Sequence, residues 1–532
     1  MHTTRLNLLA TGFLVLFTNF AFFRNVTAAY PDTLYTLAFT ASLGILLAGF
    51  IMLLLTLLTW QPVTRPLLAV ILLLASVTAY FMDSYNVVID TGMIRNVVQT
   101  DVRESLDLFD YRLLVYVLLL GILPALFVLR VPIKPRPFRH ELFAKLKVSA
   151  VIVVVITAQL LLFSKAYASF FREHKPLRYY SNPLTSLWSG GKYLAESIPT
   201  GPLIVEALGM DAVTPPGDKH RELVIFVLGE TARADRFSLN GYARETNPLL
   251  ARENVISLTD MQACGTSTAV SVPCIFSRLG RADYSDDKAK RSENLLDVLA
   301  HAGVQVLWRD NNSSSKGVAD RVAYQDFRTP ENNTVCDDEC RDEGMLVGLQ
   351  DYINGTGSGD IFIVLHQMGN HGPAYYKRYP AEFEKFTPVC RTSQLEECSS
   401  EEINNAYDNA ILYTDYFLSK VIALLRQNDE RFETAMMYIS DHGESLGEHG
   451  VYLHGLPWIM APDAQKDVSA VLWFDGNFDT DVVSTLQANS ARPWSHDNIF
   501  HTVLGLLEID TAIYDPELDI TRPTQAQQLS LD

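Results

Sequence analysis

The sequence is short of positive charge. Its 43 lysines and arginines face 61 aspartates and glutamates, which gives a formal net charge of −18. This balance argues against nucleic acid as a partner, because phosphate backbones attract basic surfaces. Internal repeats and low-complexity tracts are also missing. With 532 residues the chain is too long for one hydrophobic core, so we expect two or more domains.

Long apolar runs are missing after residue 170, whereas five runs of about membrane-spanning length precede it. They cover approximately residues 7–23, 37–58, 67–82, 113–129 and 148–163. The first run lacks a small-residue cleavage site ahead of the second, which favours a span over a cleaved signal peptide. Few charges lie inside the runs, which disfavours a transporter. The sequence therefore predicts a helical membrane domain of five spans over residues 1–165.

Lysine and arginine are unevenly distributed among the loops. The loop between the fourth and fifth spans carries six of them, so the positive-inside rule places it in the cytoplasm. Five spans then put the amino terminus in the cytoplasm, and residues 83–111 and everything after residue 165 outside. Residues 166–220, with Trp188 and several tyrosines, suit a connector at the membrane interface. A soluble domain is expected over residues 221–532.

Cysteine is absent from the first 263 residues, and the six cysteines that follow form three pairs of close neighbours. An even number confined to the exported part implies disulfides in an oxidising compartment. Free buried thiols or a zinc–thiolate site are the alternatives, but Cys-x-x-Cys spacing is missing. Each expected bridge closes a small loop and contributes at most about 3 kcal/mol. The expected pairs are Cys264–Cys274, Cys336–Cys340 and Cys390–Cys398.

The exported part alternates strand-like and helix-like segments. Buried strands are expected at residues 223–228, 304–308, 361–365, 434–439 and 468–474, with helical patterns such as 294–302 and 404–426 between them. This alternation predicts an α/β/α domain with a mostly parallel sheet that helices cover on both faces.

Polar side chains follow four of these strands. Because the carboxyl ends of parallel strands meet at one edge of a sheet, we expect these side chains to lie together. Any one of them alone is explained equally well by a helix cap or a turn, but four strands ending in this way favour a site. The residues are Glu230 after the first strand, Asn312 and Lys316 after the second, His366 and His371 after the third, and Asp441, His442, Glu448, His449 and His454 after the fourth.

Glu230, Asp441 and His442 would supply three ligands to a zinc ion. Catalytic zinc is typically held by three protein ligands, which leaves a fourth position open. Hydrogen-bond donors around that position, together with the metal, would suit a phosphoryl or sulfuryl group. The expected donors are Asn312, Lys316, His371 and His454.

Residues 264–274 offer several hydroxyl groups ahead of a helix start. A metal beside such a hydroxyl lowers its pKa and makes it a nucleophile. The residues alone leave the choice open among Thr266, Ser267, Thr268 and Ser271, and at least one of them suits a helix N-cap.

In these motifs the chain resembles the lipid A phosphoethanolamine transferases, the family that includes the mobile colistin-resistance enzymes. The resemblance covers essentially the whole length, and it implies an alkaline-phosphatase-like or sulfatase-like periplasmic domain attached to five spans in the Gram-negative inner membrane. The motifs that carry it are Gly229-Glu230-Thr231, Cys264-Gly265-Thr266-Ser267-Thr268, Asp310-Asn311-Asn312 with Lys316, His371-Gly372-Pro373, Ser440-Asp441-His442-Gly443-Glu444 and His454-Gly455.

The resemblance also implies roles for individual residues. Thr268 matches the nucleophile of the family, and it matches a zinc ligand together with Glu230, Asp441 and His442. One zinc ion would be tightly bound, and a second could join during turnover. The phosphate-side and second-metal positions match Asn312, Lys316, His371 and His454, of which the last three would also be catalytic. A sulfatase would need a Cys-x-Pro-x-Arg setting, whereas Cys264 is followed by Gly-Thr-Ser.

The external loop between the third and fourth spans carries Asn96, Thr100 and Glu104, which are four residues apart and would share one face of a helix. The resemblance implies that this face receives the lipid donor. Without the resemblance, a solvated helix face explains the spacing equally well.

The activity implied is a ping-pong transfer. Phosphatidylethanolamine would donate phosphoethanolamine to Thr268, and a lipid A phosphate would accept it, which lowers surface negative charge and confers polymyxin resistance. Membrane lipids are further partners, and we expect a monomer. The alternatives are the same chemistry on core heptose, a core sugar phosphate or glucan, a phosphoglycerol transferase, and an inactive membrane-anchored binding protein. Retention of every expected ligand disfavours the last.

Overall fold

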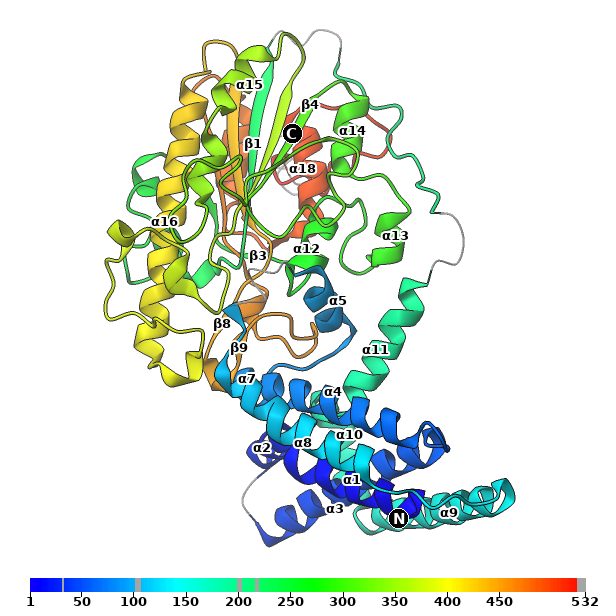
Figure 1. The fold of residues 1–532 in the computed structure, drawn as a ribbon. Helices are drawn as coiled ribbons and strands as arrows, with labels where there is room; N and C mark the ends of the chain where they lie inside the picture. The colour runs from blue at the N-terminus through cyan, green and yellow to red at the C-terminus, as the bar shows by residue number, and fades with distance from the viewer. Residues whose placement is uncertain (31–32, 101–106, 199–202, 216–219, 524–532) are drawn as a thin grey trace. The chain divides into compact units, whose positions relative to one another are not determined.

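The computed structural model describes residues 1–30, 33–100, 107–198, 203–215 and 220–523 (Figure 1). The chain divides into two compact units. The first comprises Met1–Arg95 and Phe109–Ile198, and the second comprises Asn96–Leu108 and Pro199–Asp532. The described residues 96–100 and 107–108 therefore belong to the carboxyl-terminal unit, although they lie in sequence between two membrane helices.

The first unit is helical. Within the described residues, four helical stretches are long and apolar enough to cross a membrane, and a bent pair of helices would make a fifth, which agrees with the predicted helical membrane domain. The stretches are α3 (Leu34–Leu58), α4 (Thr64–Tyr85), α7 to α8 (Tyr111–Arg130) and α9 (Phe138–Leu162), and the bent pair is α1 (Thr3–Phe17) with α2 (Phe20–Ala29). Amphipathic α10 (Ser164–Glu173) and α11 (Leu184–Ser197) follow.

The first predicted span is broken rather than continuous, because α1 and α2 meet at 54°. The side chains of Thr18 and Asn19 both donate to the backbone carbonyl of Leu14, at 2.8 and 3.0 Å. Side-chain bonds of this kind compete with the helix's own hydrogen bonds and favour a bend. Asn19 is buried and also donates to the carbonyl of Asn182, so the bend is fastened to the rest of the unit.

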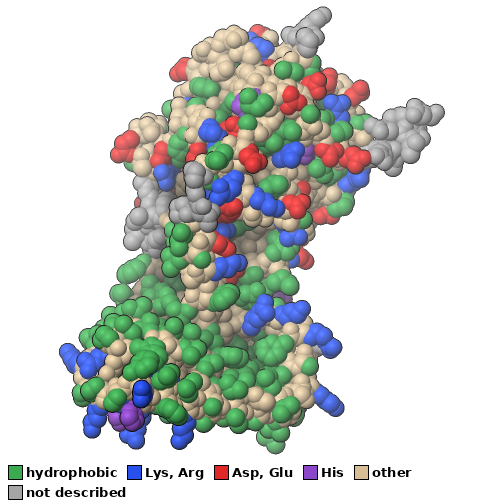
Figure 2. Space-filling model, turned by 90° about the vertical axis from the view of Figure 1, so that its right-hand side faces the viewer, with side chains coloured by type: hydrophobic (Ala, Val, Ile, Leu, Met, Phe, Trp, Pro, Cys, Tyr) green, Lys and Arg blue, Asp and Glu red, His purple; other side chains and the backbone are tan. Residues whose placement is uncertain are grey.

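On the face that Figure 2 shows, hydrophobic side chains cover much of this unit, whereas acidic and basic side chains are interspersed over the other unit. On α9, for example, Val154 and Leu161 are 67% and 73% exposed. Exposed apolar surface of this extent is typical of helices that face lipid.

The second unit is built on a seven-stranded sheet with the order β2-β10-β7-β1-β6-β4-β5. Five consecutive strands, β7, β1, β6, β4 and β5, are parallel, as predicted, while β10 runs antiparallel to both of its neighbours. The predicted strand at 468–474 is therefore the antiparallel one. The strands are β1 (Glu222–Gly229), β2 (Ile256–Leu258), β4 (Gln305–Asp310), β5 (Ala323–Asp326), β6 (Ile361–His366), β7 (Glu433–Ser440) and β10 (Ala470–Phe474).

Alternation along β1 divides the core into two layers. Val224, Phe226 and Leu228 pack with one hydrophobic cluster, and the residues between them, such as Ile225 and Val227, pack with the other. This is the period-two pattern of a strand buried on both faces. The first layer includes α12 (Thr268–Ile275), α14 (Leu295–His301) and α18 (Ile499–Leu506), and the second includes α15 (Leu349–Gly355) and the long α16 (Ser400–Arg426). The structure thus confirms the predicted fold class.

All six cysteines form disulfides, in the short-range pairs that their spacing predicts. Cys264–Cys274 joins the loop before α12 to the helix itself. Cys336–Cys340 and Cys390–Cys398 close loops of the same unit.

Candidate active site

The register of the parallel strands brings the predicted site residues to one edge of the sheet. Gly229 of β1 is level with Ser440 of β7, so Glu230 and Asp441 begin neighbouring loops. Asp310 of β4 is level with His366 of β6. The carboxyl ends of four parallel strands thus open onto one space, as the order of polar residues in the sequence predicted.

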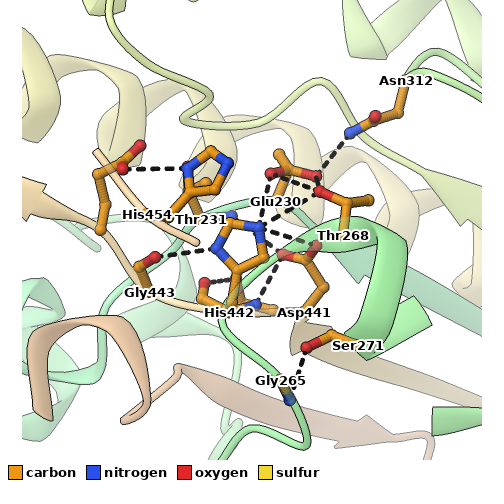
Figure 3. A network of polar contacts seen from close by, with 12 residues as sticks. Glu230, Thr231, Gly265, Thr268, Ser271, Asn312, Asp441, His442, Gly443 and His454 are labelled. Carbon is orange, nitrogen blue, oxygen red and sulfur yellow. Dashed lines mark hydrogen bonds and ion pairs between the residues drawn. The ribbon is translucent and has the colours of Figure 1, made fainter. Parts of the chain in front are cut away.

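Glu230, Asp441 and His442 are fully buried, and each offers a ligand atom within 4.8 Å of the others (Figure 3). His442 Nε2 lies 3.3 Å from Glu230 Oε1 and 3.4 Å from Asp441 Oδ2. Two other atoms of the group are tied to the backbone. The amides of Thr231 and His442 donate to Asp441 Oδ1, at 3.2 and 2.7 Å, and His442 Nδ1 lies 2.9 Å from the carbonyl oxygen of Gly443.

This arrangement places two fully buried carboxylates side by side, and their negative charges favour a bound cation. Burial raises the pKa of Asp441 to about 7, and the charge of Glu230 adds to the effect. Burial alone would lower the pKa of His442, but the two carboxylates raise it to about 10. Among the described residues, Asp441 Oδ2 makes no hydrogen bond, and His442 Nε2 approaches it to 3.4 Å. Two carboxylate oxygens and an imidazole nitrogen are a donor set that zinc accepts, so the residues fit the predicted metal.

Thr268 is the hydroxyl that reaches this group. Its Oγ1 lies 3.1 Å from Glu230 Oε2 and 3.3 Å from His442 Nε2 (Figure 3). It is the first residue of α12, whose amino-terminal backbone dipoles favour negative charge. Thr268 is also 4% exposed, so the hydroxyl is shielded from bulk water.

The neighbouring hydroxyls have structural partners instead. Thr266 donates to the carbonyl of Leu456 at 2.7 Å, and Ser271 accepts from the amide of Gly265 at 2.9 Å. Ser267 is the N-cap residue of α12, and its carbonyl accepts the first helical hydrogen bonds. A Cβ at Gly265 would approach Val270 to 2.7 Å, so this turn accepts only glycine without rearrangement. The choice that the sequence left open falls geometrically on Thr268.

Asn312 is bonded on every side. Its Nδ2 donates to Glu230 Oε2 at 2.8 Å and to the carbonyl of Gln367 at 2.7 Å, while its Oδ1 accepts from Ser313. With 1% exposure, Asn312 holds Glu230 in place, a contact that the predicted phosphate-side role did not include. Asp310 in turn accepts the amide of Asn312 at 2.9 Å, and its other oxygen lies 3.0 Å from the buried His366 Nδ1.

Lys316 and the two histidines lie around this group. Lys316 Nζ donates to Ser313 Oγ at 2.6 Å, next to Asn312. The rings of His371 and His454 are 5.4 Å apart, and those of His454 and His442 are 4.4 Å apart. Burial lowers the pKa of His371 to about 3, which keeps its imidazole neutral.

Glu444 is a site residue whose role the sequence did not reveal. It is fully buried, and its Oε1 lies 3.1 Å from His454 Nδ1. A carboxylate at Nδ1 fixes the tautomer of the imidazole and leaves Nε2 as the free nitrogen. The sequence did contain a hint of this role, since Glu444 ends the motif Ser440-Asp441-His442-Gly443-Glu444. Its partner His454, however, lies ten residues further along the chain.

Two of the three residues predicted to receive the lipid donor are described. Asn96 lies in α5 (Thr91–Gln99), and Thr100 follows the helix, with its hydroxyl donating to the carbonyl of Asn96 at 2.7 Å. Glu104 lies outside the described residues.

Comparison with known proteins bears on the whole chain. Residues 47–198 match the family model described as phosphoethanolamine transferase EptA/EptB, and residues 222–509 match the sulfatase family model. The chain is 43% identical over 510 residues to the phosphatidylethanolamine transferase Mcr-2 of Escherichia coli, which covers 93% of each protein. It is 40% identical over 529 residues to the phosphoethanolamine transferase EptA of E. coli K12, which covers 96% of this chain and 95% of the relative.

Among solved structures, the integral membrane lipooligosaccharide phosphoethanolamine transferase A (EptA) of Neisseria meningitidis superimposes with a TM-score of 0.92. The match covers 98% of both chains at 34% sequence identity. Both the helical unit and the sheet domain are therefore shared with that protein.

Proposed function

The chain belongs to the EptA/EptB phosphoethanolamine transferase family, as its motifs predicted, and we propose that it moves phosphoethanolamine from phosphatidylethanolamine to a lipid A phosphate. The single observation that carries the proposed chemistry is the Thr268 hydroxyl, 3.1 Å from Glu230 and 3.3 Å from His442 at the start of α12. The names of the relatives support both substrates: Mcr-2 is a phosphatidylethanolamine transferase, and the Neisseria protein acts on lipooligosaccharide.

We infer that Glu230, Thr268, Asp441 and His442 hold one zinc ion. When bound, the ion neutralises the two carboxylates and lowers the pKa of the threonine hydroxyl. Glu230 accepts the hydrogen bond of that hydroxyl and is itself held by Asn312, so the nucleophile and its partner are oriented before the donor arrives.

The proposed reaction has two steps. Thr268 Oγ1 forms a bond to phosphorus as the bond from phosphorus to the glycerol oxygen breaks, and the proton lost by Thr268 ends on the diacylglycerol that leaves. A lipid A phosphate oxygen then attacks the same phosphorus, and Thr268 recovers a proton as its bond to phosphorus breaks. His371 and His454 are the candidates for carrying these protons, and Lys316 for balancing charge on the transferred group.

The cellular setting follows from the same proposal. We propose that the chain crosses the inner membrane of a Gram-negative cell five times, with the amino terminus in the cytoplasm and the carboxyl-terminal unit in the periplasm. The proposed domains are residues 1–165, 166–220 and 221–532, and the proposed active form is a monomer. Each transfer adds an ammonium group to lipid A. The added positive charge weakens the binding of cationic peptides such as polymyxin.

Mass spectrometry of lipid A tests this function. Cells that express the chain should carry lipid A heavier by one phosphoethanolamine, and the purified protein incubated with donor alone should carry the same mass on Thr268. Both additions should disappear in Thr268→Ala and persist in Ser267→Ala, the matched control, whose hydroxyl makes no side-chain capping bond. Labelling of the Thr268→Ala protein would rule out the assigned nucleophile, and unmodified lipid A with a labelled protein would rule out the acceptor.

A further inference from the structure

Arg378 joins three separate segments of the carboxyl-terminal unit. It follows the short helix Tyr375–Lys377 and is 4% exposed. Its Nε donates to the carbonyl of His371 at 2.7 Å, its Nη1 to Glu339 Oε2 at 2.6 Å, and its Nη2 to Asp107 Oδ2 at 2.7 Å. Because a guanidinium holds its donors in one rigid plane, these bonds determine how the three segments lie against each other.

Asp107 belongs to the segment Asn96–Leu108, which lies in sequence between membrane helices α4 and α7. Its side chain is nearly buried at 9% exposure, and its second oxygen accepts from Lys377 Nζ at 2.5 Å. One carboxylate thus meets two cations, of which Arg378 is buried and Lys377 is 32% exposed. The buried pair with Arg378 is the one that is sensitive to the loss of a partner.

The same segment contacts the site at a second point. The carbonyl of Gln99 accepts from Lys316 Nζ at 3.2 Å, and Lys316 is also bonded to Ser313 beside Asn312. Gln99 stands between Asn96 and Thr100, the two described residues of the predicted donor-binding face. On either side of residues 101–106, which lie outside the described residues, Gln99 and Asp107 therefore both bond to the unit that carries Thr268.

The turn that presents His371 is held from two sides. On one side, the amide of Asn370 donates to the carbonyl of Glu230 at 3.1 Å, and a Cβ on Gly369 would approach that carbonyl to 2.9 Å. On the other side, Arg378 takes the carbonyl of His371. A displacement of Arg378 would therefore act on a turn that is packed against the ligand Glu230.

We propose that Asp107 and Arg378 are positioning residues for the transfer. Asp107 holds the donor-binding segment in a fixed position on the catalytic unit, and Arg378 connects Asp107 to the turn that presents His371. This inference rests on the proposed function. It assigns the two residues different effects. Loss of the Asp107 charge releases the segment but leaves Arg378 bonded to His371 and Glu339, whereas an altered Arg378 disturbs the turn as well.

Transfer assays of the full-length protein with two different phosphoethanolamine donors distinguish these effects. One is phosphatidylethanolamine in mixed micelles, which must be aligned by the segment. The other is water-soluble p-nitrophenyl phosphoethanolamine, which reports only on attack by Thr268. Asp107→Asn should lower kcat/KM for the lipid donor by about 10- to 100-fold, the scale expected of a displaced substrate, and leave the soluble donor within about twofold. Asp107→Glu, which keeps the charge, should restore most of the lipid activity.

Arg378→Lys should lower activity with both donors, because lysine cannot bond three segments at once. Lys377→Met, which removes one of the two cations on Asp107, should give a smaller loss with the lipid donor alone. Glu384→Gln, which breaks the exposed pair with Arg391, is the matched control and should change neither activity. Equal losses with both donors in Asp107→Asn, or no loss with either, would overturn the proposal.

Hydrogen–deuterium exchange tests the proposed attachment without an activity assay. Relative to wild type and to Glu384→Gln, the Asp107→Asn protein should exchange faster at residues 96–100 and equally at residues 369–373, and the Arg378→Lys protein faster at both. Unchanged exchange at residues 96–100 in Asp107→Asn would contradict the proposed attachment even if the acceptor were not lipid A. Conversely, a wild-type chain that leaves lipid A unmodified contradicts only the proposed function.

Discussion

The side-chain amide of Asn312 donates to Glu230 Oε2 at 2.8 Å, on the same oxygen that accepts the Thr268 hydroxyl at 3.1 Å. One carboxylate oxygen thus links the residue after β4 to the residue that begins α12. The bond explains why Asn312 is buried to 1% exposure at a place that the sequence marked as a substrate contact.

Asn312→Ala should weaken zinc binding, because Glu230 would lose the donor that orients it. Partners of metal ligands typically contribute about 10- to 100-fold to affinity. Competition with a chelator measures the zinc affinity, and phosphoethanolamine transfer should fall with it. The control is Asn332→Ala, whose amide donates to a backbone carbonyl at an exposed position. An unchanged affinity would show that Asn312 acts elsewhere in the reaction.

Asp441→Ala should remove the bound metal. Elemental analysis should find one zinc per wild-type chain and close to none in the variant, since only one carboxylate, one imidazole and one hydroxyl would remain to hold the ion against a chelator. Chelation of wild-type protein should lower its melting temperature, because a ligand that binds only the folded state stabilises it. Asp463→Ala, at an exposed carboxylate that pairs with Lys466, is the control. Full zinc occupancy in Asp441→Ala would refute this ligand set.

Glu444→Gln should reduce transfer while zinc content stays constant. The amide cannot hold His454 Nδ1 as the charged carboxylate does, so the imidazole loses its fixed tautomer. Loss of an oriented acid–base group costs about 10²- to 10⁴-fold in kcat. The comparison is Glu448→Gln, which alters a pair with Arg233 close by in the chain. If Glu444→Gln instead lost its zinc, Glu444 would belong to the metal site rather than to His454.

Because Asp415 has a raised pKa, we expect the folding stability of the protein to depend on pH. Burial raises its pKa from 3.8 to about 6, while the amides of Leu249 and Leu250, which it accepts at 2.9 Å each, lower it by less. The native chain therefore holds a proton that the unfolded chain loses, and stability should fall as pH rises from about 4 to about 6. A shift of roughly two units corresponds to about 3 kcal/mol.

Melting temperatures of wild type and Asp415→Asn across this window test the sign. The difference between the two proteins should change between pH 4 and pH 6 and stay constant above pH 7. A constant difference throughout would mean that Asp415 keeps an ordinary pKa despite its burial.

The sequence predicted the sheet and the ligand cluster for a local reason. Buried parallel strands appear as short apolar runs, and the residue after each run is delivered to a shared edge, so Glu230, Asp441 and His442 could be placed together without coordinates. The direction of β10 was not predictable from its apolar run, since strand polarity depends on the connection that precedes it. The bend between α1 and α2 was not predictable either, because Thr18 and Asn19 lie inside an otherwise apolar run that looks like one continuous span.

Other features depend on partners that are distant in the chain. Glu230 and Asn312 are 82 residues apart, and Asp107 and Arg378 are 271 residues apart. No spacing or composition connects such pairs, because their proximity follows from the order of strands and from how loops return to the sheet.

The sequence by itself determined the division into apolar helices and an exported α/β domain, the disulfide pairs and the family, because each follows from hydropathy, short spacing or contiguous motifs. Only the tertiary structure decided which hydroxyl meets the ligand cluster, that Asn312 serves Glu230, that Glu444 serves His454, and that Asp107 is bonded to Arg378. The residues in each of these pairs are brought together by the order of the strands and the paths of the loops, and both are set only when the unit folds.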